Sequence, residues 1–317
     1  MKTVKAVAPY IYDGGINFKH KPYEAWVKLG GQVAPAHYPP RWLHGLAFRY
    51  ELPMVVKGLR SKVEGQSEAR LRFVEPVSLY FDTFPDYCLY EIIPFFWDVW
   101  PQYFDKVFAW LRKHQVRTAI FTSSQVAEMV REQFPEMNVL HCPEGIDVEN
   151  YMPSKPLKER TIDFLEYGRN IDKVVKYNFD GIKVVRGQKC GKNTLSKEEL
   201  SNAILNSKIV AEYPKSWTNP EEAGEIETLT QRYWEGMVSG CVMIGHAPKE
   251  LIDLIGYNPV IELDKNNPDG QLREIISNIE DYQDLVDRNR DSVTQCGDWG
   301  AIIRQVMREL AEIGYSI

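Results

Sequence analysis

The sequence has few of the features that would assign it to several common classes of protein. It has five cysteines among 317 residues, and they are widely scattered with no Cys-x-x-Cys pair. An odd and scattered set of this kind indicates neither a disulfide framework nor a zinc site. No stretch approaches the ~20 apolar residues of a membrane span, and the apolar run after Met1 is too short for a signal peptide. These absences predict a protein of the reducing cytoplasm.

An excess of positive charge is also missing. The 38 lysines and arginines are outnumbered by 44 aspartates and glutamates, for a formal net charge of −6. A general nucleic-acid-binding protein needs a net basic surface to displace counterions from phosphates, so we expect no nucleic-acid partner. The sequence also lacks the Gly-x-Gly-x-x-Gly run that a nicotinamide-dependent oxidoreductase carries after a strand. This argues against a dinucleotide cofactor.

The length and composition fit two α/β domains. A chain of 317 residues suffices for two domains of ordinary size, and 44% apolar with 26% charged residues is typical of a soluble globular protein. In the first half the expected strands are 4–12, 32–36, 87–98, 117–123 and 138–142, and the expected helices are 22–29, 103–114 and 125–134. Residues 38–86 receive no predicted topology.

A second alternating unit follows an interruption at Pro153-Ser-Lys-Pro156. Its expected strands are 162–167, 182–185, 208–213, 241–244 and 259–263, and its expected helices are 197–206, 229–239, 249–255, 270–289 and 299–313. Alternation of this kind is typical of a parallel sheet covered by helices. The sequence therefore predicts domains at 1–153 and 154–317.

The segment 227–245 combines a helix with the strand that follows it. Thr228 and Gln231 fit the capping-box pattern, which predicts a helix that begins near Leu229 and ends before Gly240. At such a helix start the unpaired amide N–H groups and the positive end of the macrodipole favour a bound diphosphate.

Two carboxylates flank this expected helix start. Glu227 lies just before the helix, and Glu235 falls on its polar face. Carboxylates in these positions would accept hydrogen bonds from sugar hydroxyls on either side of a diphosphate. The pattern predicts a nucleotide-sugar site in outline, and an ordinary helix with two glutamates near its exposed face is the alternative.

The segment resembles the Glu-x7-Glu signature of retaining GT-B glycosyltransferases of group 1, with Thr230 where glycine is common and Val242 where proline is common. The resemblance implies an α/β fold of the GT-B type, in which two Rossmann-like domains face a central cleft and the donor lies at the carboxyl ends of the strands. It also implies that the terminal helix, within 299–317, packs back on the N-terminal domain. In this family Glu235 would bind the ribose hydroxyls and Glu227 the transferred sugar.

The resemblance extends to residues that would bind the diphosphate. Gly168-Arg169 follows an expected strand, and Lys173 would supply a second cation, with Lys176 as its substitute. Gly14-Gly15 resembles the glycine pair that lets backbone amides approach the donor, and an ordinary turn explains it equally well. The implied donor-binding residues are Gly14, Gly15, Gly168, Arg169, Lys173, Glu227, Thr228, Leu229, Thr230, Glu235 and His246.

Fewer residues indicate the acceptor side. Asp98, after an apolar run, is the candidate that would face the donor sugar, with His37 and His44 as weaker candidates. A role as a helix N-cap is the alternative for Asp98. The implied catalytic residues are Glu227, Arg169, Lys173 and Asp98. The basic and apolar stretch 41–72 would either lie against an anionic membrane or form a solvated face.

Together these features predict a cytoplasmic retaining glycosyltransferase, peripheral at the inner membrane face if 41–72 binds lipid. It would move a sugar from a UDP- or GDP-linked donor to a glycan or lipid-linked acceptor in cell-surface glycan synthesis. The resemblance implies no metal or other cofactor, because Arg169, Lys173 and the helix start meet the charge on the leaving diphosphate, and no Asp-x-Asp run is present. A non-catalytic nucleotide-sugar-binding protein of the same fold is the alternative.

Overall fold

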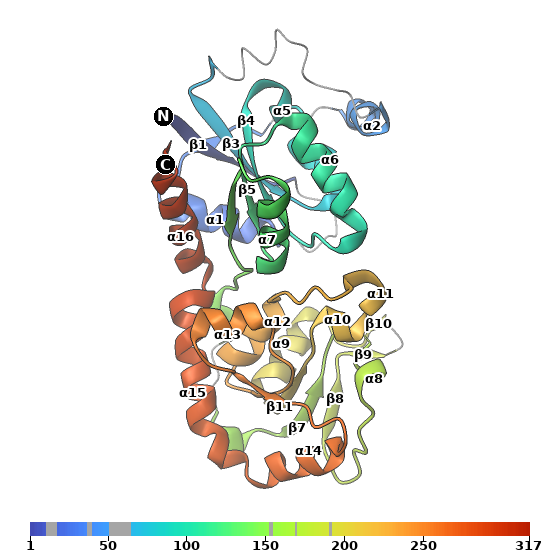
Figure 1. The fold of residues 1–317 in the computed structure, drawn as a ribbon. Helices are drawn as coiled ribbons and strands as arrows, with labels where there is room; N and C mark the ends of the chain where they lie inside the picture. Colours follow the sequence, from blue (N-terminus) through green and yellow to red (C-terminus); the bar gives the residue numbers. More distant parts are fainter. Residues whose placement is uncertain (11–17, 37–39, 51–64, 152–154, 169, 190–191) are drawn as a thin grey trace. The chain divides into compact units, whose positions relative to one another are not determined.

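The computed structural model describes residues 1–10, 18–36, 40–50, 65–151, 155–168, 170–189 and 192–317. The chain divides into two compact units (Figure 1). Unit 1 comprises Met1–Pro143 with Trp299–Ile317, and unit 2 comprises Glu144–Asp298. Within the described ranges no helix is long and apolar enough to span a membrane.

Unit 1 is built on a parallel sheet with the strand order β14-β1-β3-β4-β5-β6, and β2 pairs with β1. The strands are β1 (Lys2–Val7), β2 (Val33–Ala34), β3 (Glu68–Val74), β4 (Glu91–Phe96), β5 (Thr118–Phe121), β6 (Asn138–His141) and β14 (Tyr315–Ser316). The helices are α1 (His20–Lys28), α2 (Arg41–Tyr50), α4 (Leu79–Thr83), α5 (Asp86–Leu89), α6 (Phe104–His114), α7 (Ser124–Gln133) and α16 (Trp299–Glu312), with 3-10 turns η1 (Pro76–Ser78) and η2 (Pro101–Tyr103).

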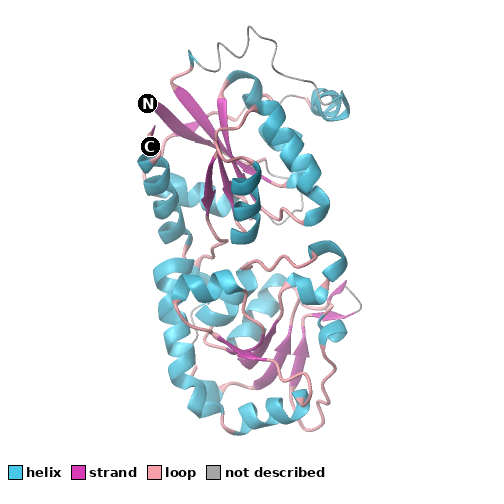
Figure 2. Ribbon diagram, viewed as in Figure 1, coloured by secondary structure: helices cyan, strands magenta, loops and turns pink. Residues whose placement is uncertain are grey.

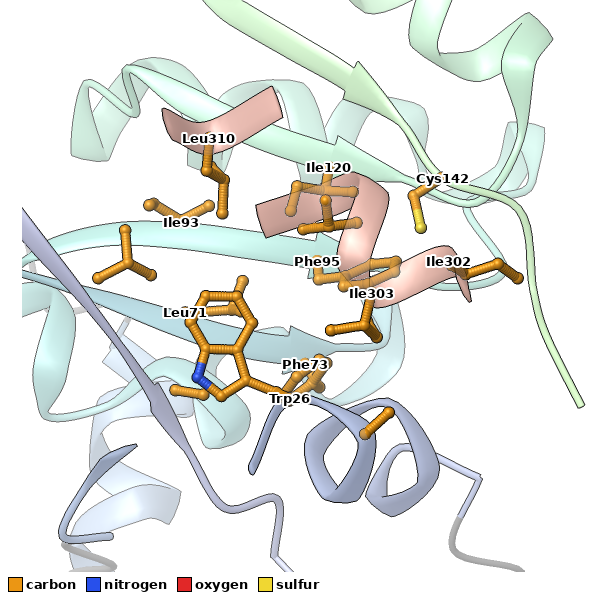
Figure 3. Close-up of a cluster of buried hydrophobic side chains, with 14 of the residues drawn as sticks. Trp26, Leu71, Phe73, Ile93, Phe95, Ile120, Cys142, Ile302, Ile303 and Leu310 are labelled. Atoms are coloured by element: carbon orange, nitrogen blue, oxygen red, sulfur yellow. The ribbon is translucent and has the colours of Figure 1, made fainter. Parts of the chain in front are cut away.

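Helices α1 and α16 pack against each other, although they come from opposite ends of the chain. Ile302, Ile303 and Leu310 of α16 lie in the same apolar cluster as Leu71 and Ile93 of the sheet (Figure 3). Apolar residues recur along α16 at helical spacing, so one face of the helix is buried in this core. Strand β14 then pairs with β1, which ties the last residues into unit 1.

Unit 2 has a parallel sheet with the strand order β13-β12-β11-β7-β8 and a separate antiparallel pair, β9 and β10. The strands are β7 (Ile162–Glu166), β8 (Val184–Arg186), β9 (Gln188–Lys189), β10 (Lys192–Asn193), β11 (Ser207–Glu212), β12 (Val242–Gly245) and β13 (Val260–Glu262). The helices are α8 (Ile171–Val174), α9 (Lys197–Leu205), α10 (Lys215–Thr218), α11 (Pro220–Ala223), α12 (Gln231–Val238), α13 (Lys249–Ile255), α14 (Pro268–Ser277) and α15 (Gln283–Ser292). Shorter turns are η3 (Val148–Tyr151), η4 (Leu157–Glu159), η5 (Ile279–Tyr282) and the π-helical η6 (Val293–Gly297).

Helices cover both faces of the unit 2 sheet (Figure 2). Leu165 and Val210 belong to a core cluster that includes residues of α9, α12 and α13. Their neighbours Phe164 and Ile209 belong to a second cluster that includes residues of α8 and α14. Because successive strand residues point to opposite faces, the two clusters lie on opposite sides of the sheet. The unit therefore has the doubly wound α/β arrangement that places ligand sites at the carboxyl ends of the strands.

Strand β3 lies within the range 38–86, for which the sequence predicted no topology, and it occupies the centre of the unit 1 sheet between β1 and β4. Its two arginines, Arg70 and Arg72, are buried. Arg72 pairs with Asp86 at 3.3 Å, and the Arg70 guanidinium lies 3.9 Å from the centre of the Tyr90 ring. These two residues therefore cannot belong to the basic surface that was considered for 41–72. The predicted strand 87–98 is also too long, because residues 86–89 form α5.

The division between the units falls between residues 143 and 144, earlier than the predicted boundary after 153. Ile146 forms a parallel bridge with Asp298, and Trp234 donates from Nε1 to the backbone oxygen of Glu144 at 2.6 Å. These contacts attach the segment after residue 143 to unit 2. A proline pair can mark a break in the pattern, but tertiary hydrogen bonds decide where the chain passes from one core to the other.

Candidate functional site

The carboxyl ends of the unit 2 strands meet at one edge of the sheet, and the start of α12 lies at this edge. Strand β7 runs into Tyr167, and β12 runs into His246. Tyr167 donates its hydroxyl to the backbone oxygen of Arg232 at 3.1 Å, and Tyr233 donates to the backbone oxygen of His246 at 2.7 Å. These bonds hold the first turn of α12 against two strand ends.

Helix α12 begins at Gln231 with Thr230 as its N-cap, so the predicted capping box at Thr228 is wrong. The Thr228 hydroxyl instead donates to Oε1 of Glu250 at 3.1 Å, and the Leu229 amide donates to the same carboxylate. Glu250 is buried on α13. Because a buried carboxylate binds donors strongly, it engages the two residues that the pattern assigned to the helix start.

Glu235 lies on α12 and accepts a hydrogen bond from the Tyr151 hydroxyl, with 2.9 Å between Oε1 and the phenolic oxygen. Burial and the nearby negative charge of Glu235 raise the pKa of Tyr151. The phenol therefore remains a donor at neutral pH and holds the Glu235 carboxylate in place.

Glu227 and His246, two predicted site residues, are brought together. Nε2 of His246 lies 3.2 Å from Oε2 of Glu227, and Nδ1 lies 2.9 Å from Oε2 of Glu262. The Ser216 hydroxyl donates to Oε1 of Glu227 at 3.3 Å. The Trp217 ring stacks on the imidazole with 4.8 Å between the ring centres. Side chains from several segments thus fix Glu227, and the sequence predicted no role for Glu262.

Gly168, which follows β7, has a left-handed φ of +111° and lies directly against Arg232. A Cβ atom on residue 168 would lie 2.0 Å from Nη1 of Arg232, so any other residue would displace the guanidinium and would also strain the backbone at this φ. The loop after β7 and the first turn of α12 are therefore in contact. Arg169, the next residue, lies outside the described residues, as do Gly14 and Gly15.

Three buried polar atoms in this part of unit 2 have no hydrogen-bond partner among the described residues: Oγ1 of Thr230, Nη1 of Arg232 and Oε2 of Glu212. Buried polar atoms are nearly always paired in folded proteins. The Thr230 hydroxyl and the Arg232 guanidinium are donors, and they belong to a helix start beside a glycine loop. This donor set fits a ligand with anionic oxygens.

Glu212, the last residue of β11, is fully buried and accepts a hydrogen bond from the Tyr167 hydroxyl at 2.9 Å. Burial raises the pKa of its carboxyl to about 7, while the positive charge of Arg232 acts in the opposite direction. Glu212 therefore titrates near neutral pH. The sequence predicted no role for either Glu212, which lies outside the motifs that carried the resemblance, or Arg232, which is one of the seven unspecified residues between Glu227 and Glu235.

Lys173 is exposed on α8, and its Nζ lies 3.9 Å from Oε1 of Glu221. An exposed ion pair of this kind is weak, so it would not prevent the lysine from binding a ligand. Lys176, its substitute, is also exposed. The role of Lys173 as a second cation stays a prediction.

The corresponding edge of unit 1 is acidic. Asp98 follows β4 with a φ of +51° and an exposed side chain, and it is not the cap of the next turn, which Trp100 precedes. Glu75 follows the neighbouring strand β3, and its Oε2 lies 3.5 Å from Nζ of Lys19. Burial raises the pKa of Glu75, the Lys19 charge lowers it, and the negative charges of Asp82 and Asp98 raise it further.

The remaining candidates add little to this edge. His37 lies outside the described residues, and so does the side chain of His44. In the described part of the chain, no group of three or more histidine, cysteine, aspartate or glutamate side chains is arranged to hold a metal ion.

Several solved structures resemble the chain over almost its whole length. HepE from Anabaena in complex with UDP-glucose superposes with a TM-score of 0.58 at 10% identity, covering 98% of this chain and 100% of that one. Sucrose-phosphate synthase from Thermosynechococcus elongatus gives 0.56 at 11% identity over 99% of both chains. A glycosyltransferase from Rickettsia africae ESF-5 gives 0.54 at 10% identity over 98% of both chains. The sequence matches no protein-family model and no curated protein.

At these identities the likeness establishes the fold. The two α/β units with parallel sheets, together with these neighbours, show that the chain has the GT-B fold. The fold class that the resemblance implied is thereby confirmed, and the chemistry must be argued from the site.

Proposed function

We propose that this chain is a retaining glycosyltransferase whose nucleotide-diphosphate sugar binds at the start of α12. The observation that carries the proposal is the contact of Gly168 with α12, where buried donors of Thr230 and Arg232 have no partner among the described residues. Glu227 and Glu235 flank this turn in the sequence. A diphosphate supplies the anionic oxygens that these donors require. The likeness to HepE, which was solved with UDP-glucose, supports a donor of this class.

Each carboxylate has a proposed partner in the donor. Glu235, already oriented by Tyr151, accepts hydrogen bonds from the ribose hydroxyls. Glu227, held by His246 and Ser216, accepts from hydroxyls of the transferred sugar. His246 is proposed to lie beside that sugar because it shares a hydrogen bond with Glu227.

The proposed reaction is a same-face displacement. The acceptor hydroxyl forms a bond to the anomeric carbon as the bond to the diphosphate oxygen breaks, and the departing phosphate oxygen takes the hydroxyl proton. Negative charge develops on the leaving diphosphate, where Arg169, Lys173 and the dipole of α12 stabilise it. Asp98 is proposed as the unit 1 residue that contacts the transferred sugar, and Gly14 and Gly15 as backbone donors. The scheme requires no metal ion.

The acceptor is proposed to be a glycan or a lipid-linked sugar in cell-surface glycan synthesis, with the enzyme in the cytoplasm. Among the described residues of 41–72, the support for contact with an anionic membrane comes from α2, where Trp42 is 67% exposed and Leu46 and Arg49 are also exposed. Because Arg70 and Arg72 are buried, the basic surface is smaller than the composition of 41–72 indicated.

A panel of nucleotide sugars tests the proposal. We expect UDP- or GDP-linked sugars to raise the melting temperature, and slow hydrolysis of the stabilising donor to continue unchanged in EDTA. Loss of hydrolysis in EDTA that manganese restores would contradict the metal-independent scheme. Stabilisation without hydrolysis or transfer to any acceptor would instead favour the alternative, a non-catalytic nucleotide-sugar-binding protein. The absence of any stabilisation would contradict both.

A further inference from the structure

We propose that Arg232 binds the donor directly, by donating from Nη1 to an anionic oxygen of its diphosphate group. This inference rests on the proposed function, because it adds a residue to the same site. Neither the Glu-x7-Glu carboxylates nor the Gly-Arg pair that carried the resemblance includes Arg232.

The orientation of the Arg232 guanidinium supports this contact. Nη2 of Arg232 lies 3.4 Å from the backbone oxygen of Tyr213, and Nη1 lies against Gly168. Nη1 is buried and has no hydrogen-bond partner among the described residues. One end of the guanidinium is thus held by the protein, while a buried N–H of the other end is directed at the loop where the diphosphate is proposed to bind.

Two backbone donors at the start of α12 already have partners in the protein. The Leu229 amide donates to the Glu250 carboxylate, and the Gln231 amide donates to Oε2 of Glu144 at 3.2 Å. The first amide of the helix, that of Gln231, and the amide just before the N-cap, that of Leu229, are therefore engaged by protein carboxylates and not offered to an anion. These carboxylates also make the surroundings less favourable for a diphosphate. A cation in the first turn offsets both effects.

A buried carboxylate, that of Glu212, accompanies the Arg232 guanidinium. Glu212 is fully buried and interacts electrostatically with Arg232, and the Tyr167 hydroxyl joins the two by bonding to Glu212 and to the backbone oxygen of Arg232. A buried guanidinium is costly unless a charge or a ligand compensates it. In its ionised form Glu212 supplies this charge, and it leaves Nη1 of Arg232 without a partner among the described residues, so the arginine is held in place for an anionic ligand.

The test compares ligands that share a base and differ in phosphate content. Calorimetry would measure the affinity of wild type and Arg232→Gln for uridine, UMP and UDP, for guanosine, GMP and GDP, and for pyrophosphate alone. We expect Arg232→Gln to bind the preferred diphosphate at least about tenfold more weakly, with nucleoside affinity unchanged. Pyrophosphate affinity should fall by a similar factor, because Arg232 is proposed to contact the diphosphate group alone.

Arg288→Gln is the matched control, because Arg288 is an exposed arginine of unit 2 that lies over the Tyr257 ring. It should leave every affinity unchanged. A folded Arg232→Gln variant with wild-type diphosphate affinity, or with equal losses for nucleoside and diphosphate, would overturn the inference and leave the proposed function standing. If wild type binds no nucleotide, the proposed function and the inference both fail.

Arg232→Lys serves if the glutamine variant does not fold. Lysine keeps the charge but lacks the planar pair of donors, so diphosphate affinity should fall by about threefold to tenfold with nucleoside affinity unchanged. Wild-type diphosphate affinity in this variant would overturn the inference.

Discussion

The carboxyl edges of the two sheets have the same architecture and different chemistry. The unit 2 edge also carries carboxylates, those of Glu212 and Glu227, but there the buried donors of Thr230 and Arg232 adjoin a glycine loop. At the unit 1 edge, Glu75 and Asp98 follow neighbouring strands, and Lys19 is engaged by Glu75 and Asp82. Donor groups suit the anionic part of a nucleotide sugar, whereas carboxylates suit the hydroxyls of an uncharged acceptor. Substitutions at the two edges should therefore have different consequences for donor and acceptor.

Removing Arg169, the cation predicted to bind the diphosphate, should lower turnover more than any other change. Arg169→Ala is expected to lower turnover by about 100-fold or more, because the arginine stabilises charge that develops on the leaving group, while free nucleoside binds nearly as before. Steady-state kinetics and nucleoside titration measure the two effects. Arg112→Ala, an exposed change in unit 1, is the control. Normal turnover in Arg169→Ala would remove the residue from the site.

Glu212 should make the stability of the protein depend on pH. Its pKa is raised from 4.5 to about 7, so its contribution to stability is fully present below pH 4.5 and is lost as the pH rises through about 7. The shift corresponds to at most about 3 kcal/mol. The free energy of unfolding of Glu212→Gln, relative to that of wild type, should therefore be larger at about pH 8 than at about pH 5. Urea unfolding at both values measures this change, and an unchanged difference would contradict it. Glu274→Gln, an exposed change on α14, is the control.

Glu235→Ala is expected to weaken nucleotide binding by about tenfold, because the carboxylate makes charge-assisted hydrogen bonds to the ribose. The nucleoside alone should show the same loss, since the ribose is common to both ligands. Calorimetry with Glu274→Ala as the control measures this effect. Unchanged affinity in a folded variant would exclude the ribose contact.

Changes at Glu75 and Asp98 should leave the binding of free nucleotide unchanged. Glu75→Gln is expected to raise the KM for acceptor by about threefold to tenfold. Asp98→Asn, which loses a contact with the transferred sugar, is expected to lower turnover by a similar factor, and both variants should keep the wild-type affinity for free nucleotide. Initial rates at varied acceptor, with parallel nucleotide titrations, separate the two effects. Weakened nucleotide binding in either variant would break the proposed division of roles.

The sequence predicted unit 2 more fully than unit 1 for a physical reason. The strands around the motif are apolar runs, and the predicted helix end at Gly240 is confirmed by its left-handed φ of +64°. The helix start was wrong, because Glu250, from another helix, engages Thr228. The role proposed for Arg232 could not be predicted from the residues beside it in the sequence. The residues that define its surroundings are Gly168, in the loop after β7, and Glu212, at the end of β11.

In unit 1, the sequence pattern did not predict the buried strand β3. Its charged residues alternate with apolar ones, so Arg70 and Arg72 read as a basic surface. Asp86, which begins α5, and Tyr90, which directly follows α5, accommodate them in the interior. A local pattern cannot reveal that a charged residue has a buried partner elsewhere in the chain.

The start of α12 is proposed to bind the phosphates of a nucleotide sugar. Hydrogen exchange measured by mass spectrometry, with and without a saturating donor from the panel, tests it most directly. We expect slower exchange in peptides covering 227–235 and 167–173, and unchanged exchange in the peptide covering α14 (Pro268–Ser277). Slower exchange in other segments, with unchanged exchange in 227–235, would contradict donor binding at the start of α12.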